Sequence, residues 1–79
     1  MPIENDVKSQ ILIIGGRPDE PDKLHGNTKL KALAYNSNML IKLENALQRI
    51  ADKFNTGKII TPGSLTADKT VSDCINATK

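Results

Sequence analysis

The sequence predicts an α+β domain dominated by helices, with one long or kinked central helix, a short C-terminal helix and at most two short strands. Three observations lead to this prediction. Leucine and phenylalanine recur every seven residues in the middle of the chain, a short apolar run ends at a glycine pair, and a second apolar segment follows a Pro-Gly turn near the C-terminus. Because the chain has 79 residues, 38% of them apolar, we expect one small domain over residues 1–79.

The first expected element is a short strand over residues 10–14, QILII. This run is rich in β-branched residues and is stopped by Gly15 and Gly16, a pattern that favours a buried strand. Residues 15–26 hold two prolines, three glycines and three acidic residues, which is typical of a loop. Residues 1–26 are therefore predicted to form an N-terminal strand and loop.

The central helix is predicted over residues 27–56, with Asn27 or Thr28 as its N-cap and Gly57 as its stop. Its signal is a seven-residue repeat of large apolar side chains and the positions between them: Leu33, Leu40, Leu47 and Phe54, with Leu43 and Ile50. The Asn-Ser-Asn sequence at 36–38 favours caps and turns, because these side chains compete for backbone hydrogen bonds. A break of the helix at this point stays open.

Residues 57–79 are predicted to begin with a second short strand at 57–61, followed by a turn at TPGS. A final helix is expected from Ser64 or Thr66. Its apolar side would consist of Ala67, Val71, Cys74 and Ile75.

The composition limits the kinds of site that the chain can build. Cys74 is the only cysteine and His25 the only histidine, which excludes an internal disulfide, a cysteine-based zinc site and a multi-histidine metal site. A lone cysteine fits a reducing compartment. The chain shows no secretory signal and no run of about eighteen apolar residues. We therefore expect a cytoplasmic protein without membrane association.

The segment GGRPDEPDK, residues 15–23, lacks the glycine and lysine spacing of a phosphate-binding loop, and its prolines remove N–H donors. Its carboxylates at Asp19, Glu20 and Asp22 would repel a phosphate, although Arg17 could hold a single anion. Carboxylates are also calcium ligands, but their spacing departs from the calcium-binding helix–loop–helix pattern. A surface loop without a cofactor, metal or small-molecule ligand is the expectation.

Catalytic chemistry is not predicted. His25 is a candidate general base, but no serine or cysteine nucleophile stands at a recognisable spacing from it. Cys74 falls on the apolar side of the expected final helix and resembles a small core residue. The sequence therefore favours a protein that is not an enzyme.

The apolar stripe of the central helix is wider than the seam of a two-stranded coiled coil, which suits a bundle or an interface. At ~1.5 Å per residue this helix would be roughly 40 Å long, with few other elements to cover it. We therefore predict a protein-binding module for assembly, adaptation or inhibition that forms a homo-oligomer or docks on a protein partner. The predicted partner-binding residues are Met39, Leu40, Leu43, Leu47, Ile50 and Phe54. A private core made of the same residues stays open as the alternative.

The alternative function is a small DNA-binding regulator. Residues 1–26 carry a net charge of −2 and residues 27–79 a net charge of +4, and a basic face can steer an anionic partner. Residues 70–76, TVSDCIN, are similar to the start of the recognition helix of lac-repressor-type transcription factors, where Thr, Val, Ser and a later Asn recur. The usual preceding helix and tight turn are replaced here by IITPGSLTADK. The resemblance implies nucleic-acid contacts from Lys58, Lys69, Thr70 and Ser72.

Overall fold

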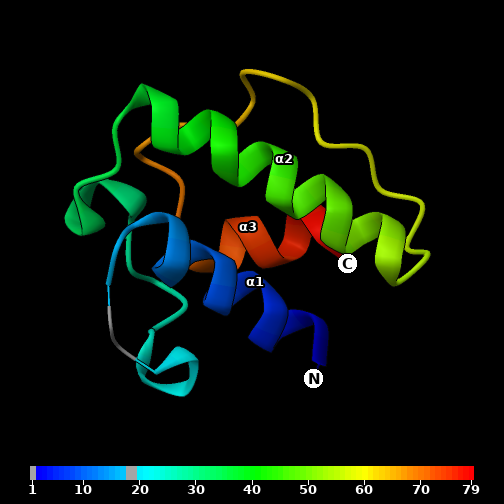
Figure 1. The fold of residues 1–79 in the computed structure, drawn as a ribbon, viewed down its shortest axis with the longest axis horizontal. Helices are drawn as coiled ribbons and strands as arrows, with labels where there is room; N and C mark the ends of the chain where they lie inside the picture. Colours follow the sequence, from blue (N-terminus) through cyan, green and yellow to red (C-terminus); the bar gives the residue numbers. More distant parts are fainter. Residues whose placement is uncertain (1, 18–19) are drawn as a thin grey trace.

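The computed structural model describes residues 2–17 and 20–79. In these residues it contains the α-helices α1 (Pro2–Ile14), α2 (Ser37–Lys53) and α3 (Val71–Thr78), and the short 3-10 helices η1 (Pro21–Lys23) and η2 (Leu30–Leu33). Each α-helix packs against the other two (Figure 1). The prediction of a helix-dominated fold is confirmed, whereas the predicted strands are absent from the described residues.

The strand predicted at 10–14 is wrong, because these residues form the last part of α1. Ile3, Val7 and Ile11 follow one another at helical spacing and are all buried. Ile13 is 66% exposed, as a residue on the opposite side of a helix should be. The apolar run at residues 10–14 is compatible with a strand or a helix when taken by itself. Because Ile3 and Val7 precede it at helical spacing, a helix buries more apolar surface than a strand would.

The glycine pair closes α1. Gly16 has a φ of 67°, the left-handed region that glycine enters without steric cost. Its N–H donates to the carbonyl of Ile13 at 3.1 Å, and the N–H of Arg17 donates to the carbonyl of Leu12 at 2.9 Å. This pair of reversed bonds is the Schellman stop of an α-helix. The glycines therefore end a helix rather than a strand.

The predicted central helix is split. Residues 30–33 form η2, and Ala34 then takes a left-handed conformation with a φ of 61°. Helix α2 begins after Asn36, whose side chain accepts a hydrogen bond from the N–H of Met39 at 2.9 Å. The proposed capping by Asn27 or Thr28 is therefore wrong, and the cap lies within the Asn-Ser-Asn sequence because Asn36 satisfies an orphan N–H of the first turn.

Helix α2 ends at Lys53, four residues before the predicted stop at Gly57. Asn55 has a φ of 54°, its N–H donates to Asp52, and the N–H of Thr56 donates to Ala51 at 3.1 Å. These bonds form a second Schellman stop, in which asparagine takes the position that glycine usually occupies. Gly57, the predicted stop, lies two residues after Asn55, in the loop that follows the helix.

The segment from 57 to 69 contains neither the strand predicted at 57–61 nor the helix start predicted at Ser64 or Thr66. Helix α3 begins only at Val71, where a capping box fixes its start. The hydroxyl of Thr70 accepts from the N–H of Asp73 at 3.2 Å, and the Asp73 carboxylate accepts from the N–H of Thr70 at 3.0 Å. This reciprocal pair satisfies two backbone donors and so sets the helix boundary.

An antiparallel contact between two distant segments takes the place of a sheet. The N–H of Leu30 donates to Lys69 at 2.9 Å, and the N–H of Val71 donates to Thr28 at 3.0 Å. Among the described residues, this pairing forms only one isolated β-bridge, between Lys29 and Thr70. The contact holds the start of α3 against the segment that leads into α2.

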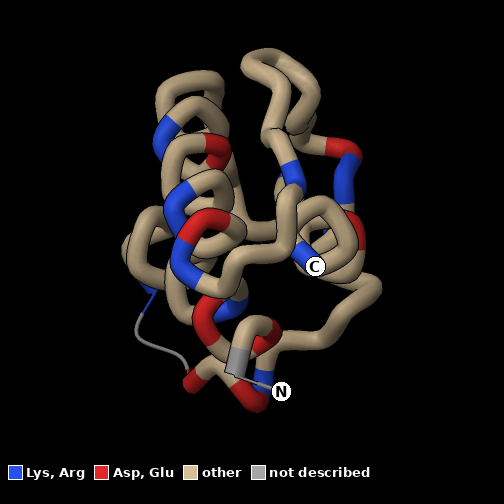
Figure 2. The backbone as a smooth tube through the Cα atoms, turned by 90° about the vertical axis from the view of Figure 1, so that its right-hand side faces the viewer, with Lys and Arg blue, Asp and Glu red and all other residues tan. Residues whose placement is uncertain are grey.

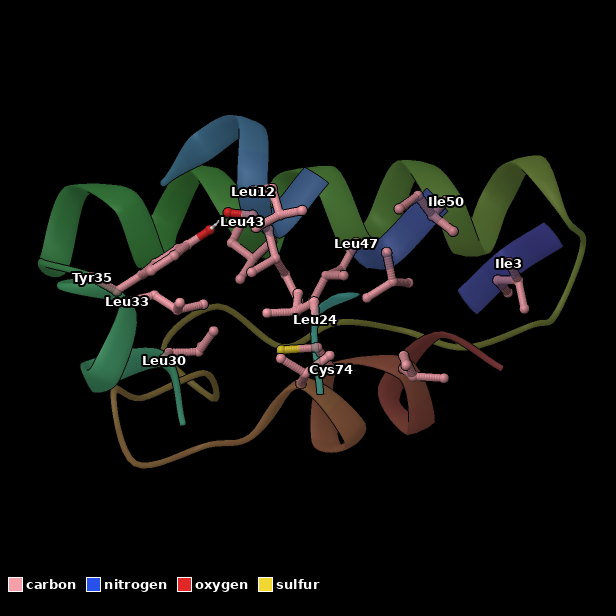
Figure 3. Close-up of a cluster of buried hydrophobic side chains, with 14 residues drawn as sticks. Ile3, Leu12, Leu24, Leu30, Leu33, Tyr35, Leu43, Leu47, Ile50 and Cys74 are labelled. Carbon is pink, nitrogen blue, oxygen red and sulfur yellow. Dashed lines mark hydrogen bonds between the residues drawn. The ribbon is translucent and has the colours of Figure 1, made fainter. Parts of the chain in front are cut away.

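The core lies between the three helices and the segment from η1 to Tyr35 (Figure 3). Its buried residues are Ile3, Val7, Ile11, Leu12, Leu24, Leu30, Leu33, Tyr35, Leu43, Leu47, Ile50, Val71, Cys74 and Ile75. The hydroxyl of Tyr35 donates to the carbonyl of Ile11 and so satisfies the one polar group of that side chain. The core draws on all three α-helices and on the segment between α1 and α2, which couples the helices to one another.

Candidate partner-binding surface

The structure places half of the predicted partner-binding residues in the core. Leu43 and Leu47 are 0% exposed, and Ile50 is also buried. The other three, Met39, Leu40 and Phe54, are half-buried and pack against the core from its margin. The apolar stripe of α2 therefore faces α1 and α3 of its own chain.

The opposite side of α2 carries an exposed apolar residue, Ile41, that is not among the predicted partner-binding residues. Ile41 is 56% exposed although it stands in the middle of a helix. Ile41 stands outside the seven-residue repeat. A large apolar residue at a position that faces away from the repeat is therefore a feature that could have been recognised in the sequence. Ile59, in the loop after α2, is 79% exposed.

Two polar side chains of α2 hold the loop of residues 58–65 on this side of the helix, where the backbone turns back along α2 (Figure 1). The Glu44 carboxylate accepts from the N–H groups of Gly63 at 2.9 Å and Leu65 at 3.0 Å. Glu44 is only 7% exposed. Because a charged acceptor strengthens a hydrogen bond, these two bonds are the main polar attachment of the loop.

Gln48 stands one helical turn after Glu44 and completes the attachment. Its side-chain carbonyl accepts from the N–H of Ile60 at 2.7 Å, and its amide nitrogen donates to the carbonyl of Lys58 at 3.2 Å. These two hydrogen bonds of Gln48 explain why residues 57–61 do not form a strand. Their backbone groups bond to helix side chains rather than to a neighbouring strand.

A hollow with a volume of about 410 Å³ lies between α2 and this loop. Its lining residues are Ile41, Glu44, Asn45, Gln48, Ile60, Pro62 and Gly63. Since Glu44 and Gln48 direct polar atoms to the loop backbone, Ile41, Ile60 and Pro62 offer the apolar part of the wall. We call Ile41, Asn45, Ile60 and Pro62 the docking surface.

The charges beside the docking surface are mainly basic. Lys42 and Arg49 are exposed, and they stand three residues before and four residues after Asn45, which makes them its neighbours on the helix. Figure 2 shows these basic positions of α2 interspersed with its two acidic ones. Lys53 is paired with Asp6 of α1 at 3.0 Å.

The segment around the glycine pair offers little for an anion. The N–H groups of Gly16 and Arg17 are already bonded to helix carbonyls, so they do not point to a ligand. Of the carboxylates weighed as calcium ligands, Asp19 lies outside the described residues, and Glu20 and Asp22 are exposed. The described part of the chain brings no three His, Cys, Asp or Glu residues together in a way that could hold a metal ion.

Cys74 and His25 lie in different environments. Cys74 is fully buried in α3, and desolvation, with a smaller contribution from the nearby Asp73 charge, raises the pKa of its thiol to about 12. A thiol with this pKa is protonated at neutral pH and is therefore a poor nucleophile. His25 is exposed in the loop before η2.

The residues of the DNA-binding alternative have structural contacts of their own. Lys58 and Lys69 are exposed, as is Ser72, whose N–H donates to Gly26 at 2.8 Å. The hydroxyl of Thr70 is the acceptor of the α3 cap. Helix α3 has eight residues, and it buries Val71, Cys74, Ile75 and Thr78. This leaves one side of a short helix for any nucleic-acid contact.

No helix in the described part of the chain combines the length and the apolar character needed to cross a membrane. Comparison with known proteins finds no matching family model, no matching curated protein and no matching solved structure.

Proposed function

We propose that this protein is a non-enzymatic protein-binding module, used for assembly, adaptation or inhibition, and that partners dock on the outer side of α2 and the 58–65 loop. The observation that carries the proposal is the exposure of Ile41 beside a hollow whose apolar wall includes Ile60 and Pro62. The apolar stripe predicted for binding then has a supporting role, because Leu43 and Leu47 fix α2 against the core.

Binding, rather than chemistry, suits the groups that surround the hollow. Of the polar side chains that line the hollow, Glu44 and Gln48 are engaged with the loop backbone. Covering Ile41 would remove apolar surface from water at a gain of about 25 cal/mol per Å². Such an interface could be formed with a second copy of the chain or with another protein.

The proposal is tested by photo-crosslinking from within the docking surface. Ile41 is replaced by benzoylphenylalanine, and Ile13, an isoleucine of α1 that is at least as exposed, is replaced in a matched control. After irradiation in native cells, we expect a covalent adduct with one defined protein from position 41 and not from position 13. An adduct with the chain itself would identify a homo-oligomer. Equal, unspecific labelling from both positions, or none from position 41, would overturn the proposal.

A further inference from the structure

We infer that the docking surface binds an acidic peptide segment that carries a bulky apolar side chain, presented by a different protein. This inference rests on the proposed function and specifies the chemistry of its partner. The apolar side chain of the segment would enter the hollow beside Ile41, Ile60 and Pro62. Its carboxylates would pair with the basic side chains on either side.

Exposed basic residues stand next to residues that line the hollow, on α2 and in the loop. On the helix side, Lys42 and Arg49 adjoin Asn45, which lines the hollow. On the loop side, Lys58 is exposed, and its backbone carbonyl is held by Gln48. A segment bound in the hollow would therefore lie near basic residues of both α2 and the loop.

The acidic residues of α2 offset this charge only in part. Glu44 is buried, and its carboxylate is directed at the N–H groups of Gly63 and Leu65. Asp52 is exposed and accepts from Gln48 at 3.0 Å. The exposed charge near the hollow is thus net positive, with Lys42, Arg49 and Lys58 against Asp52. Complementary charge at a rim governs the rate and specificity of association.

A second copy of the chain is a poorer occupant of the same surface. A two-fold interface brings identical patches together, so that residues near its axis meet their own copies. Lys42 and Arg49 of one copy would then approach the same residues of the other, and like charges facing one another disfavour the contact. Nucleic acid would match the basic residues but has no side chain to fill an apolar hollow beside Ile41.

The test is a titration of ¹⁵N-labelled protein, followed by NMR, with the capped hexapeptide Glu-Glu-Leu-Leu-Glu-Glu. We expect saturable shifts of the amides of Ile41, Asn45, Ile60 and Gly63. Two control peptides, one with lysine in place of each glutamate and one with serine in place of each leucine, should cause no comparable shifts. Binding should weaken as salt is raised from about 0.1 M to about 1 M, which shortens the Debye length from about 10 Å to about 3 Å.

Variants assign the binding to the surface. Ile41→Ala should weaken binding several-fold, and Lys42→Glu combined with Arg49→Glu should weaken it about tenfold, while the folded spectrum is retained. Ile13→Ala, a loss of the same size on α1, should leave binding unchanged. Equal binding of the lysine peptide, no binding of the acidic peptide, or a mass that doubles with protein concentration would overturn the inference. A specific adduct from position 41 together with a failed titration would remove this inference alone and leave the proposed function standing.

Discussion

The carboxylate of Glu44 accepts a hydrogen bond from the backbone N–H of Gly63 at 2.9 Å, across 19 residues of sequence. The contact fastens a loop without regular structure to the outer side of α2. The hollow beside Ile41 exists because this loop is held there. A buried charged side chain of the amphipathic helix α2 therefore shapes the docking surface.

Replacing Glu44 by alanine should destabilise the fold by about 2–3 kcal/mol, because two backbone donors lose a charged acceptor. Amide hydrogen exchange at Gly63 and Leu65 should accelerate strongly, whereas exchange in α1 should change only with global stability. Asn45→Ala, one residue later on the exposed side, is the control and should change stability by less than about 0.5 kcal/mol. Unaltered exchange at Gly63 would show that the attachment does not hold the loop.

Stability should fall at alkaline pH through Cys74 and Tyr35. Desolvation raises the pKa of Cys74 from 9.0 to about 12, and desolvation, with a smaller effect of Cys74, raises the pKa of Tyr35 above 10.0. Since both groups ionise more easily when unfolded, their contribution is complete below pH 9 and is lost as pH rises towards the folded-state values. Each group that is ionised in the unfolded state but not in the folded state lowers the free energy of unfolding by about 1.4 kcal/mol per pH unit.

Urea unfolding between pH 8 and 11 measures this effect, and Cys74→Ala provides the comparison. The variant should be less stable at pH 8 because a cavity forms, but its stability should fall less steeply between pH 9 and 10. A parallel measurement uses a thiol reagent at pH 8, with which Cys74 should react only at the rate of unfolding. Rapid labelling of the native protein would contradict the buried position of Cys74.

Ala34→Gly should stabilise the protein by about 1 kcal/mol, because alanine at a φ of 61° bears the steric cost of the left-handed region. Ala32→Gly serves as the comparison. Ala32 is exposed within η2 and lies outside the left-handed region, so glycine there should only add unfolded-state entropy and lower stability. Thermal unfolding of both variants decides the point, and a destabilised Ala34→Gly protein would argue against the break observed before α2.

Alanine substitutions at Leu47 and Ile41 should distinguish a residue needed for folding from one that is free to bind a partner. Leu47→Ala should cost about 2–5 kcal/mol, since it opens a cavity at a fully buried position. Ile41→Ala should change stability by less than about 0.5 kcal/mol. Unfolding of the Leu47 variant should be independent of protein concentration, because the apolar stripe packs within one chain. A concentration-dependent midpoint would instead place this stripe in an interface between copies.

The nucleic-acid alternative has its own test, a mobility-shift titration on mixed-sequence duplex DNA at low salt. With a protein partner as the function, we expect no micromolar binding. Tight binding that weakens steeply with salt, and that is lost when Lys58 and Lys69 are both changed to alanine, would favour the DNA-binding regulator instead.

The sequence by itself determined the features that rest on local periodicity and capping. The apolar stripe at Leu40, Leu43 and Leu47 predicted α2 because its spacing is intrinsic to a helix. The break at residues 36–38 could also be anticipated, since the asparagine side chain satisfies backbone N–H groups at a helix start. The inward side of α3, with Val71 and Cys74, followed from the same reasoning.

Only the tertiary structure decided the elements whose local sequence fits two conformations. Residues 10–14 form a helix because Ile3 and Val7 continue their apolar side onto a shared core. Residues 57–61 form a loop because Gln48 of α2 accepts from the N–H of Ile60 and donates to the carbonyl of Lys58, and Glu44 holds the residues that follow. The docking surface depends on the same long-range contacts. A periodicity describes one segment, whereas these outcomes depend on which distant side chain reaches a backbone group and satisfies its hydrogen bond.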